Sequence, residues 1–396
     1  MKIFIELVRI DEGGIKTSLI NFLNNMCDEN EIDLCVLNRN SKQEEDIPKK
    51  VNIVENKSFQ FKVNEDVKII DKKHVFKSFI YKTKRAFNQL KKYLNIFLLK
   101  KNQKLYDVSI CYCSLYTDAK YILSKTKAKC RCLIYHGDII NVPFNKRQER
   151  IFSKFDKLFF VSKSCAEVAK VKYPRLKNKI AYLYNMQNNE RVLQNANAFG
   201  VDFKNYFNIV TAARIMVEKG QLRMLTVLKK LHKEGYKFVW HLVGDGPYEE
   251  LVKNYVFENK MEDYVKFYGF QKNPYPFIKK ADLFLLCSHH EAAPMVFGES
   301  MLLQTPVLST RTRSADELVG EWGYVCENSE QSLYDVLKYI LENPQDLAEK
   351  KKNLKNYTYD NEKIKQHFYK EINGEKQWYQ KSFIIFGLGG ILSQIY

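Results

Sequence analysis

The stretch that decides the fold reads Ala281-Asp-Leu-Phe-Leu-Leu-Cys-Ser288, then two histidines, then Glu291-Ala-Ala-Pro-Met-Val-Phe-Gly-Glu299. Its first part is a short apolar run of the kind that forms a buried parallel strand. Its second part predicts a loop and then a helix over about 296–303. Ligands bind where the strands of an open α/β sheet end, so we expect Glu291 in that loop and Glu299 in the first turns of the helix.

The start of this helix offers hydrogen-bond donors beside the two acids. Backbone N–H groups there precede the first intrahelical bonds and are suited to an anion. These groups lie around the stretch Pro294, Met295, Val296 and Phe297. Carboxylates accept hydrogen bonds from hydroxyl groups, so the whole unit suits a sugar nucleotide. Two glutamates eight residues apart can also be solvated surface residues. A donor site is therefore indicated only if the flanking sequence matches one too.

The flanking sequence resembles the donor site of the retaining GT-B glycosyltransferases of family 4. Between Ala212 and Thr310 it carries Ala-Arg-Ile…Glu-Lys-Gly, Val-Gly-Asp-Gly-Pro, Tyr-Gly-Phe-Gln, Ala-Asp-Leu-Phe-Leu and the glutamate pair, in family order. Likeness is weaker over 1–185 and 311–345. The resemblance implies an α/β fold of the GT-B type, with two Rossmann-like domains that face each other across a cleft.

The resemblance also implies roles for single residues. Glu299 would bind the ribose hydroxyls, and Glu291 the hydroxyls of the donor sugar. Arg214 and Lys219, which lie between a strand and a helix, would bind the diphosphate and stabilise its growing charge in place of a metal. No metal ligand is expected. The remaining expected donor contacts are Gly13, Gly14, Gly244, Phe270 near the base, and Pro294, Met295, Val296 and Phe297.

Two features of the N-terminal half belong to the same prediction. Gly13 and Gly14 stand between a strand and a helix, where backbone can approach a ligand closely. Their spacing is neither G-x-G-x-x-G nor a P-loop, so neither an NAD nor an ATP site is indicated. His136 ends another strand. It is either a structural histidine or, as the resemblance implies, a contact to the donor sugar.

Length and composition predict two folded domains. A chain of 396 residues exceeds one ordinary core, and its 45% hydrophobic content argues against disorder. Apolar runs alternate with helical segments in both halves, as in doubly wound sheets. The expected units are an N-terminal Rossmann-like acceptor domain at 1–185, a polar linker at 186–205, a C-terminal Rossmann-like donor domain at 206–372 and a tail at 373–396.

Cysteine usage indicates a cytosolic protein. The nine cysteines are odd in number and lie mostly in apolar strand-like runs, which favours buried reduced thiols. The pairs at 111/113 and 130/132 place thiols on one strand face but lack the C-x-x-C spacing typical of zinc sites. No apolar run reaches about 18 residues, and the charged start is unlike a secretory signal.

The charge is concentrated in one segment. The net charge is +18, and residues 72–106 hold eleven Lys or Arg and no acid, with apolar residues at helical spacing. This segment is either a core-packing helix with a solvated basic face or a helix attracted to an anionic membrane surface. Nucleic acid is disfavoured because no stacking platform or binding motif accompanies the charge. The apolar end of the tail, 383–392, is too short to span a membrane.

Some positions depart from the family pattern. Ala292 and Ala293 stand where a glycine and a bulky residue are common. Gly298 is unusual inside a helix and leaves the helix start open. Glu317 keeps its acid in a segment that replaces a glycine-rich one.

Taken together, the residues and the resemblance predict a retaining, metal-independent glycosyltransferase. It would move a sugar from a nucleotide-sugar, first of all a UDP-sugar, to a saccharide or lipid-linked saccharide, with no cofactor. The expected location is the inner face of a bacterial cell membrane, in capsule or lipopolysaccharide synthesis. Two alternatives stay open: a non-catalytic membrane-associated GT-B scaffold, and another GT-B enzyme such as a sugar phosphorylase, for which no pyridoxal-phosphate lysine is recognisable.

Overall fold

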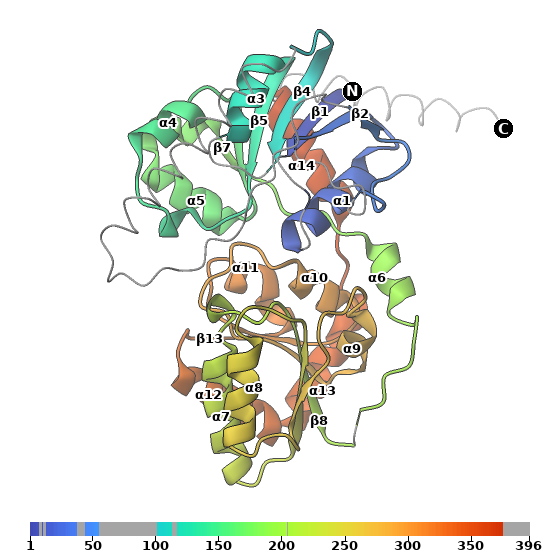
Figure 1. The fold of residues 1–396 in the computed structure, drawn as a ribbon, viewed down its shortest axis with the longest axis vertical. Helices are drawn as coiled ribbons and strands as arrows, with labels where there is room; N and C mark the ends of the chain where they lie inside the picture. The colour runs from blue at the N-terminus through green and yellow to red at the C-terminus, as the bar shows by residue number, and fades with distance from the viewer. Residues whose placement is uncertain are drawn as a thin grey trace, which may run out of the picture.

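The computed structural model describes residues 1–7, 10, 13–37, 44–54, 101–112, 117–203 and 205–374. This part of the chain alternates between strands and helices and builds two separate sheets, one above the other in Figure 1. The basic stretch up to residue 100 and the apolar end of the tail lie outside the described residues, so the predictions for them stay predictions. No described helix is long and apolar enough to cross a membrane.

Seven parallel strands form the first sheet, in the order β3-β2-β1-β4-β5-β6-β7. The order reverses between β1 and β4, the switch point at which doubly wound sheets bind ligands. The strands are β1 Lys2–Leu7, β2 Glu31–Val36, β3 Asn52–Ile53, β4 Leu105–Tyr112, β5 Lys127–Tyr135, β6 Lys157–Phe160 and β7 Ile180–Tyr182. The helices between them are α1 Gly14–Met26, α3 Thr117–Lys125, η2 Ile139–Asn141, α4 Lys146–Phe152, α5 Lys163–Lys172 and η3 Pro174–Lys179.

Six parallel strands form the second sheet, in the order β10-β9-β8-β11-β12-β13, with its switch point between β8 and β11. The strands are β8 Phe207–Ala212, β9 Phe238–Val243, β10 Val265–Phe267, β11 Leu283–Leu286, β12 Val307–Thr310 and β13 Tyr324–Cys326. The helices around them are α6 Asn189–Asn195, η4 Val217–Lys219, α7 Gln221–Lys233, α8 Glu249–Glu258, α9 Tyr275–Lys280, α10 Met295–Leu302, α11 Ala315–Val319, η5 Gly320–Trp322, α12 Glu330–Glu342, α13 Pro344–Asn353 and η6 Leu354–Asn356.

Helices cover both faces of the second sheet. One core joins it to α7, α8 and α12, through residues such as Leu228, Val252 and Leu337. The other joins it to α6, α9, α10 and α11, through residues such as Ile278 and Phe297. Because both faces are covered, every residue of β11 is buried, and this explains its unbroken apolar sequence.

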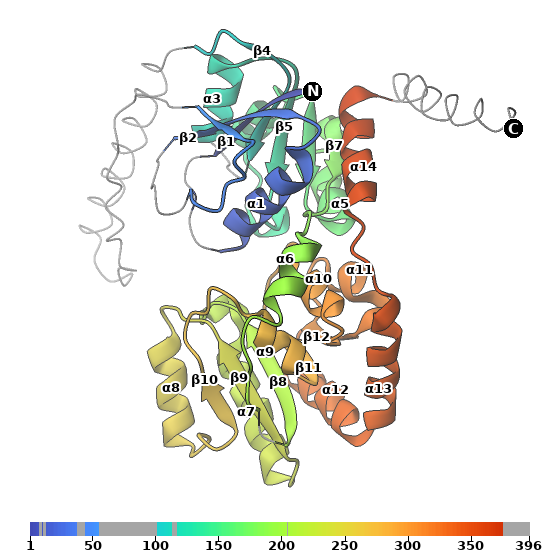
Figure 2. The same cartoon turned by 90° about the vertical axis from the view of Figure 1, so that its right-hand side faces the viewer.

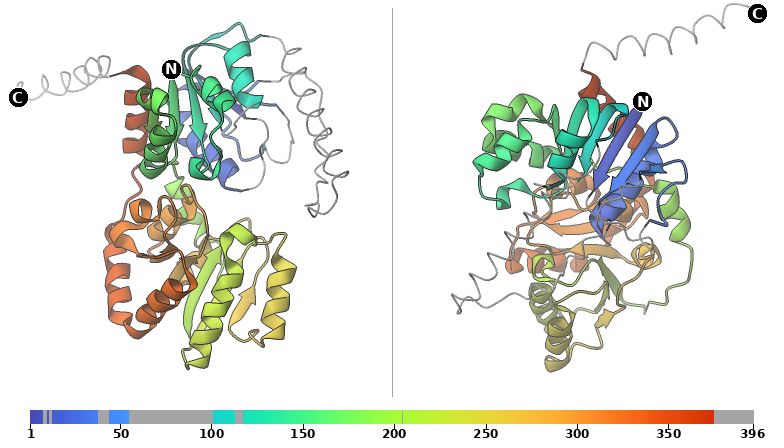
Figure 3. Two further views of the ribbon diagram at one scale, coloured as in Figure 1. Left: turned by 90° about the vertical axis from the view of Figure 1, so that its left-hand side faces the viewer. Right: turned by 45° about the horizontal axis from the view of Figure 1, so that its top comes forward.

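The last described helix corrects the predicted domain boundary. α14, Asn361–Asn373, was expected in the second domain, but its residues Ile364 and Phe368 belong to the core of the first sheet. The Phe368 ring packs edge-on against Phe22 of α1, with ring centroids 5.8 Å apart. Figure 2 and the left view of Figure 3 show this red helix beside the first domain. The chain therefore crosses between the domains twice.

Hydrogen bonds join the two crossing segments to each other. The hydroxyl of Tyr359 donates to the carbonyl of Asn185 over 2.6 Å, and the side-chain amide of Asn361 donates to the carbonyl of Gln187 over 2.7 Å. Both segments lie against α10 at Gly298, where a Cβ would come within 2.5 Å of the Tyr359 ring and 2.7 Å of Gln187 Oε1. The unusual glycine inside this helix thus makes room for the two crossing segments.

The predicted linker, 186–205, is not plain coil. It contains α6, whose Val192 is buried in one of the two cores of the second domain. An asparagine starts this helix: the Asn188 side chain accepts a hydrogen bond from the backbone N–H of Arg191, as a good N-cap does. The polar, Asn-rich composition of the stretch therefore reflects a capped helix on the surface of the second domain.

Candidate functional site

Lys219 and Glu291 meet at the carboxyl edge of the second sheet. Lys219 ends η4 after β8, and Glu291 follows β11. The Lys219 ammonium lies 2.5 Å from Glu291 Oε1, with both side chains largely buried. The hydroxyl of Ser288 donates to the same carboxylate oxygen over 2.7 Å. The structure thus joins two predicted site residues and adds Ser288, which the sequence analysis did not single out although it stands at the strand end three residues earlier.

A left-handed glycine fixes the position of Lys219. Gly220 has φ 72°, and a Cβ there would lie 2.1 Å from the carbonyl oxygen of Cys287. The loop after β8 and the end of β11 therefore touch backbone to backbone, which only glycine permits. The thiol of Cys287 also lies 3.3 Å from the Lys219 carbonyl oxygen.

Arg214 lies on the neighbouring part of the same loop. Its side chain is exposed, and its carbonyl accepts a 2.8 Å hydrogen bond from the side-chain amide of Gln221. The loop after β9 packs directly onto this segment, because a Cβ at Gly244 would lie 2.1 Å from the Ala213 carbonyl oxygen. Gly244 therefore serves the packing of two loops, and its place near a donor stays a prediction.

The loop after β10 joins the same group. The backbone N–H of Gly244 donates to the carbonyl of Gly269 over 2.7 Å, next to Phe270. The Phe270 side chain is 56% exposed, so a large apolar ring is open to solvent there. An exposed ring beside the loops that carry Arg214 and Gly244 is suited to stack on a flat ligand such as a nucleobase.

The first turn of α10 lies one loop further along. Pro294 is its N-cap, with Met295 and Val296 as the first helical residues, all three partly buried. Proline has no N–H, so the donors here are the backbone N–H groups of Met295 and Val296, which have no partner four residues earlier in the helix. Phe297 points elsewhere: its side chain is fully buried in the core under the sheet, so only its backbone is available to a ligand.

Glu299 is buried inside the second domain. Its exposed fraction is only 7%, and the hydroxyl of Tyr275 in α9 donates to its Oε1 over 3.2 Å. Burial raises the pKa of Glu299 from 4.5 to about 7, against the hydrogen bond from Tyr275 and the positive charge of Arg191. Tyr275 is a site residue that the sequence analysis missed. It stands between two prolines, and this pattern gave no chemical signal.

The predicted residues of the first domain lie at the ends of β1 and β5. A Cβ built on Gly13 or Gly14 would meet no atom of the described residues within 4 Å. The His136 ring packs on Tyr112 with centroids 4.7 Å apart. Its buried Nε2 has no hydrogen-bond partner among the described residues, and burial lowers its pKa to about 4. At neutral pH His136 is therefore uncharged.

Polar side chains of the second domain contact the first domain. Arg313 in the second domain forms an ion pair with Asp138, just after His136, at 3.1 Å. Glu317 in α11 accepts hydrogen bonds from the backbone N–H groups of Lys163 and Ser164, which begin α5. Burial raises the pKa of Glu317, but the hydrogen bonds from Ser164 and its neighbours outweigh it and hold the pKa below the usual value.

The first domain also touches the loop that carries Glu291. The thiol of Cys165 lies 3.6 Å from the carbonyl oxygen of Ala292, and the side-chain amide of Asn185 donates to the Ala293 carbonyl over 3.4 Å. Small side chains at these two positions allow this approach of the domains. The departure from the family pattern noted above thus lies at a domain contact.

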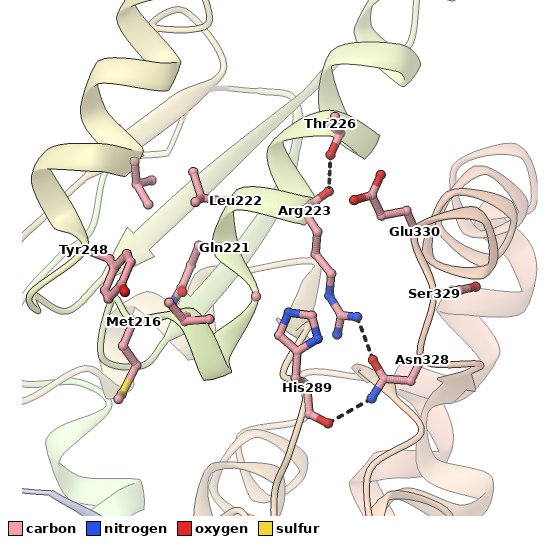
Figure 4. Close-up of a pocket in the computed structure, with 13 residues that line it drawn as sticks. Met216, Gln221, Leu222, Arg223, Thr226, Tyr248, His289, Asn328, Ser329 and Glu330 are labelled. Carbon is pink, nitrogen blue, oxygen red and sulfur yellow. Dashed lines mark hydrogen bonds between the residues drawn. The ribbon is translucent and has the colours of Figure 1, made fainter. Parts of the chain in front are cut away.

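A cavity of about 590 Å³ lies behind this site, on the face of the sheet covered by α7, α8 and α12. Figure 4 shows Arg223, His289 and Asn328 at its wall. None of the predicted site residues lines it. Among the described residues, no group of three or more His, Cys, Asp or Glu side chains is placed to hold a metal ion.

Comparison with known proteins shows similarity to glycosyltransferases. Residues 194–361 match the family model described as glycosyl transferases group 1. A lipopolysaccharide core biosynthesis glycosyltransferase of Rhizobium meliloti, LpsD, is 30% identical over 26% of this chain and 29% of its own length. A Campylobacter jejuni N-acetylgalactosaminyltransferase that acts on a diphospho-undecaprenol-linked saccharide is 29% identical over 41% of this chain and 45% of its own length. The chain thus matches less than half of either relative.

The fold matches over nearly the whole chain. The Anabaena protein HepE, crystallised with UDP, superposes with a TM-score of 0.65 at 17% identity, over 94% of this chain and 100% of that one. The expected α/β fold with two Rossmann-like domains is confirmed. The resemblance to the family 4 glycosyltransferases of capsule and lipopolysaccharide synthesis is confirmed as well, because residues 194–361 match the model of the glycosyl transferases group 1.

Proposed function

We propose that this protein is a retaining, metal-independent glycosyltransferase that transfers a sugar from a UDP-sugar to a lipid-linked saccharide in surface polysaccharide synthesis. The observation that carries the proposal is the cluster of Lys219, Glu291 and Ser288 at the carboxyl edge of the second sheet. It supplies a cation for a departing diphosphate and acceptor oxygens for sugar hydroxyls, beside the open first turn of α10.

The transfer step needs charge stabilisation at the leaving group. The bond between the anomeric carbon and the diphosphate oxygen breaks, and a bond from that carbon to the acceptor oxygen forms on the same face. The acceptor proton passes to the departing diphosphate. Lys219 and Arg214 stabilise the negative charge that grows there, while Glu291 orients the donor sugar and Glu299 the ribose.

Charge and relatives support the finer parts of the proposal. HepE has been crystallised with UDP-glucose as well as UDP, which favours a uridine nucleotide. The acceptor named for the Campylobacter jejuni relative favours a lipid-linked saccharide. A net charge of +18 favours attachment to the anionic inner face of the membrane. No cofactor takes part in the proposed reaction.

Donor screening tests this function directly. UDP should raise the melting temperature of the protein more than GDP does, and one UDP-sugar should be slowly hydrolysed by the protein alone. Activity should persist in EDTA. Loss of activity in EDTA with recovery in Mg²⁺ would contradict the metal-free mechanism. Binding of UDP with no hydrolysis or transfer from any donor would instead support the non-catalytic scaffold.

A further inference from the structure

Arg223 holds the strand end behind the Lys219–Glu291 pair. It lies in the first turn of α7 and is only 9% exposed. Its Nε and Nη2 donate to the carbonyl of Cys287 over 3.1 and 2.6 Å, and Nη2 also donates to the carbonyl of Ser288 over 2.9 Å. One guanidinium thus binds two consecutive carbonyls at the point where β11 becomes the loop that carries Glu291.

Asn328 extends this brace by one residue. Its side-chain oxygen accepts a 2.6 Å hydrogen bond from Arg223 Nη1, and its amide donates to the carbonyl of His289 over 3.0 Å. Figure 4 shows the two contacts in series. Three successive carbonyls, those of Cys287, Ser288 and His289, are therefore bound from one side by two side chains.

Other groups of Ser288 and His289 contact the site. Ser288 donates its hydroxyl to Glu291, and the backbone N–H of His289 donates to the carbonyl of Glu218, next to Lys219, over 2.7 Å. A shift of the strand end would move both partners of the ion pair. The guanidinium of Arg223 donates to Cys287, Ser288 and Asn328. No salt bridge to it occurs among the described residues.

We propose that Arg223, assisted by Asn328, is a positioning residue that sets the geometry of Lys219 and Glu291 for sugar transfer. The inference rests on the proposed function of that site. Neither side chain contacts the donor; both act through the carbonyls of residues 287–289. The planar guanidinium of arginine holds several N–H donors in a fixed geometry and can bind these carbonyls together, which a lysine cannot do.

The cavity beside Arg223 makes the idea testable by chemical rescue. In Arg223→Ala, kcat should fall about 100-fold, because a misplacement of about 1 Å costs that much. The Kd of UDP should change less than about threefold, since Phe270 and Glu299 lie on other segments. Guanidinium at millimolar concentration, entering from the cavity, should raise the kcat of this variant at least about tenfold. Arg223→Lys should not recover it.

Hydrogen exchange gives a readout that does not need turnover. The peptide 287–293 should exchange about tenfold faster in Arg223→Ala and return toward the wild-type rate with guanidinium. Lys229 lies on the same helix and donates a hydrogen bond to the side chain of Asn259, away from residues 287–289. Lys229→Ala therefore serves as the matched control, with no change in kcat or exchange.

The outcomes separate the two proposals. Normal turnover in Arg223→Ala, no rescue by guanidinium, or faster exchange across the whole domain instead of at 287–293 would each overturn the positioning role. If the wild-type protein uses no donor, the proposed function fails. Unchanged exchange at 287–293 in Arg223→Ala would then overturn the brace as well. Faster exchange that is confined to 287–293 and reversed by guanidinium would establish the brace.

Discussion

Glu317 of the second domain and Ser164 of the first are joined by two hydrogen bonds to a single carboxylate oxygen. The backbone N–H of Ser164 donates to Oε2 over 2.9 Å and its hydroxyl over 2.5 Å. Since Ser164 lies in the first turn of α5, the positive end of that helix also faces the carboxylate. One acid of the second domain thus binds the start of a helix in the first domain.

This contact should weaken in acid. The folded pKa of Glu317 lies below its ordinary value of 4.5, so its contribution to stability is present above pH 4.5 and is lost as the pH falls through the folded pKa. Glu317→Gln should therefore lower the melting temperature at pH 7 and make little difference at pH 3. Calorimetric scans of both proteins across this range check it. An equal deficit at both pH values would contradict the assignment.

Glu299 should show the opposite pH dependence. Its folded pKa is raised to about 7, so the folded state loses stability as the pH rises from 4.5 to 7. Glu299→Gln should stabilise the ligand-free protein at pH 8 by at most on the order of 3 kcal/mol, and hardly at pH 4. The same change should weaken UDP binding about tenfold, because the ribose loses a charged acceptor. Denaturant titration and calorimetry measure the two effects; unchanged UDP affinity would remove Glu299 from the ribose.

The two basic residues should affect turnover more than binding. Lys219→Ala or Arg214→Ala should lower kcat by about 10²–10³-fold with a smaller change in KM, because leaving-group charge is greatest in the transition state. Lys229→Ala is the control. Steady-state kinetics with varied donor decide the point, and a variant with normal kcat would take its residue out of the mechanism.

Gly298 should resist enlargement. An added methyl group would lie 2.5 Å from the Tyr359 ring and 2.7 Å from Gln187, so Gly298→Ala should cost about 1–3 kcal/mol of stability. Gly200→Ala, where a Cβ meets no described atom within 4 Å, should cost little and controls for the loss of glycine as such. Equal stability of the two variants would show that the crossing segments make room for the methyl group without cost.

The basic segment should decide membrane attachment. The protein should sediment with anionic vesicles and be released by about 0.5 M salt, where screening shortens to a few ångströms. Glutamine at Lys84, Arg85, Lys91 and Lys92 should abolish the binding and leave turnover of a short soluble acceptor intact. Four matched changes in the second domain, at Lys350, Lys351, Lys352 and Lys355, control for net charge. Strong binding to neutral vesicles would point to the apolar tail.

The sequence predicts the strands well because apolar runs mark them. The buried strand before Glu291 lies within the run from Ala281 to Ser288, and α10 begins at Met295, one residue before the expected start. The short β13, Tyr324–Cys326, was not predicted, since only one of its three residues is buried and the pattern is weak.

Contacts between distant segments were beyond the sequence. Nothing local to Phe368 indicates that its helix packs on the first sheet, because an amphipathic helix has an apolar stripe that fits either core. The pairing of Arg223 with the carbonyls at 287 and 288 and that of Tyr275 with Glu299 likewise depend on three-dimensional proximity. Sequence patterns identify the reactive residue types and the strand ends, while the residues that position them come from the folded structure.

The double crossing of the chain has a consequence for biosynthesis. The core of the first domain includes Phe368, yet its last strand, β7, ends at Tyr182. A ribosome adds roughly 5–20 residues per second, so about 10–40 s separate the synthesis of that strand from the arrival of α14. During this interval the apolar surface around Phe22 and Phe159 stays uncovered. The nascent first domain is then the stage at which aggregation and chaperone binding concentrate, and it matures only after the second domain has been made.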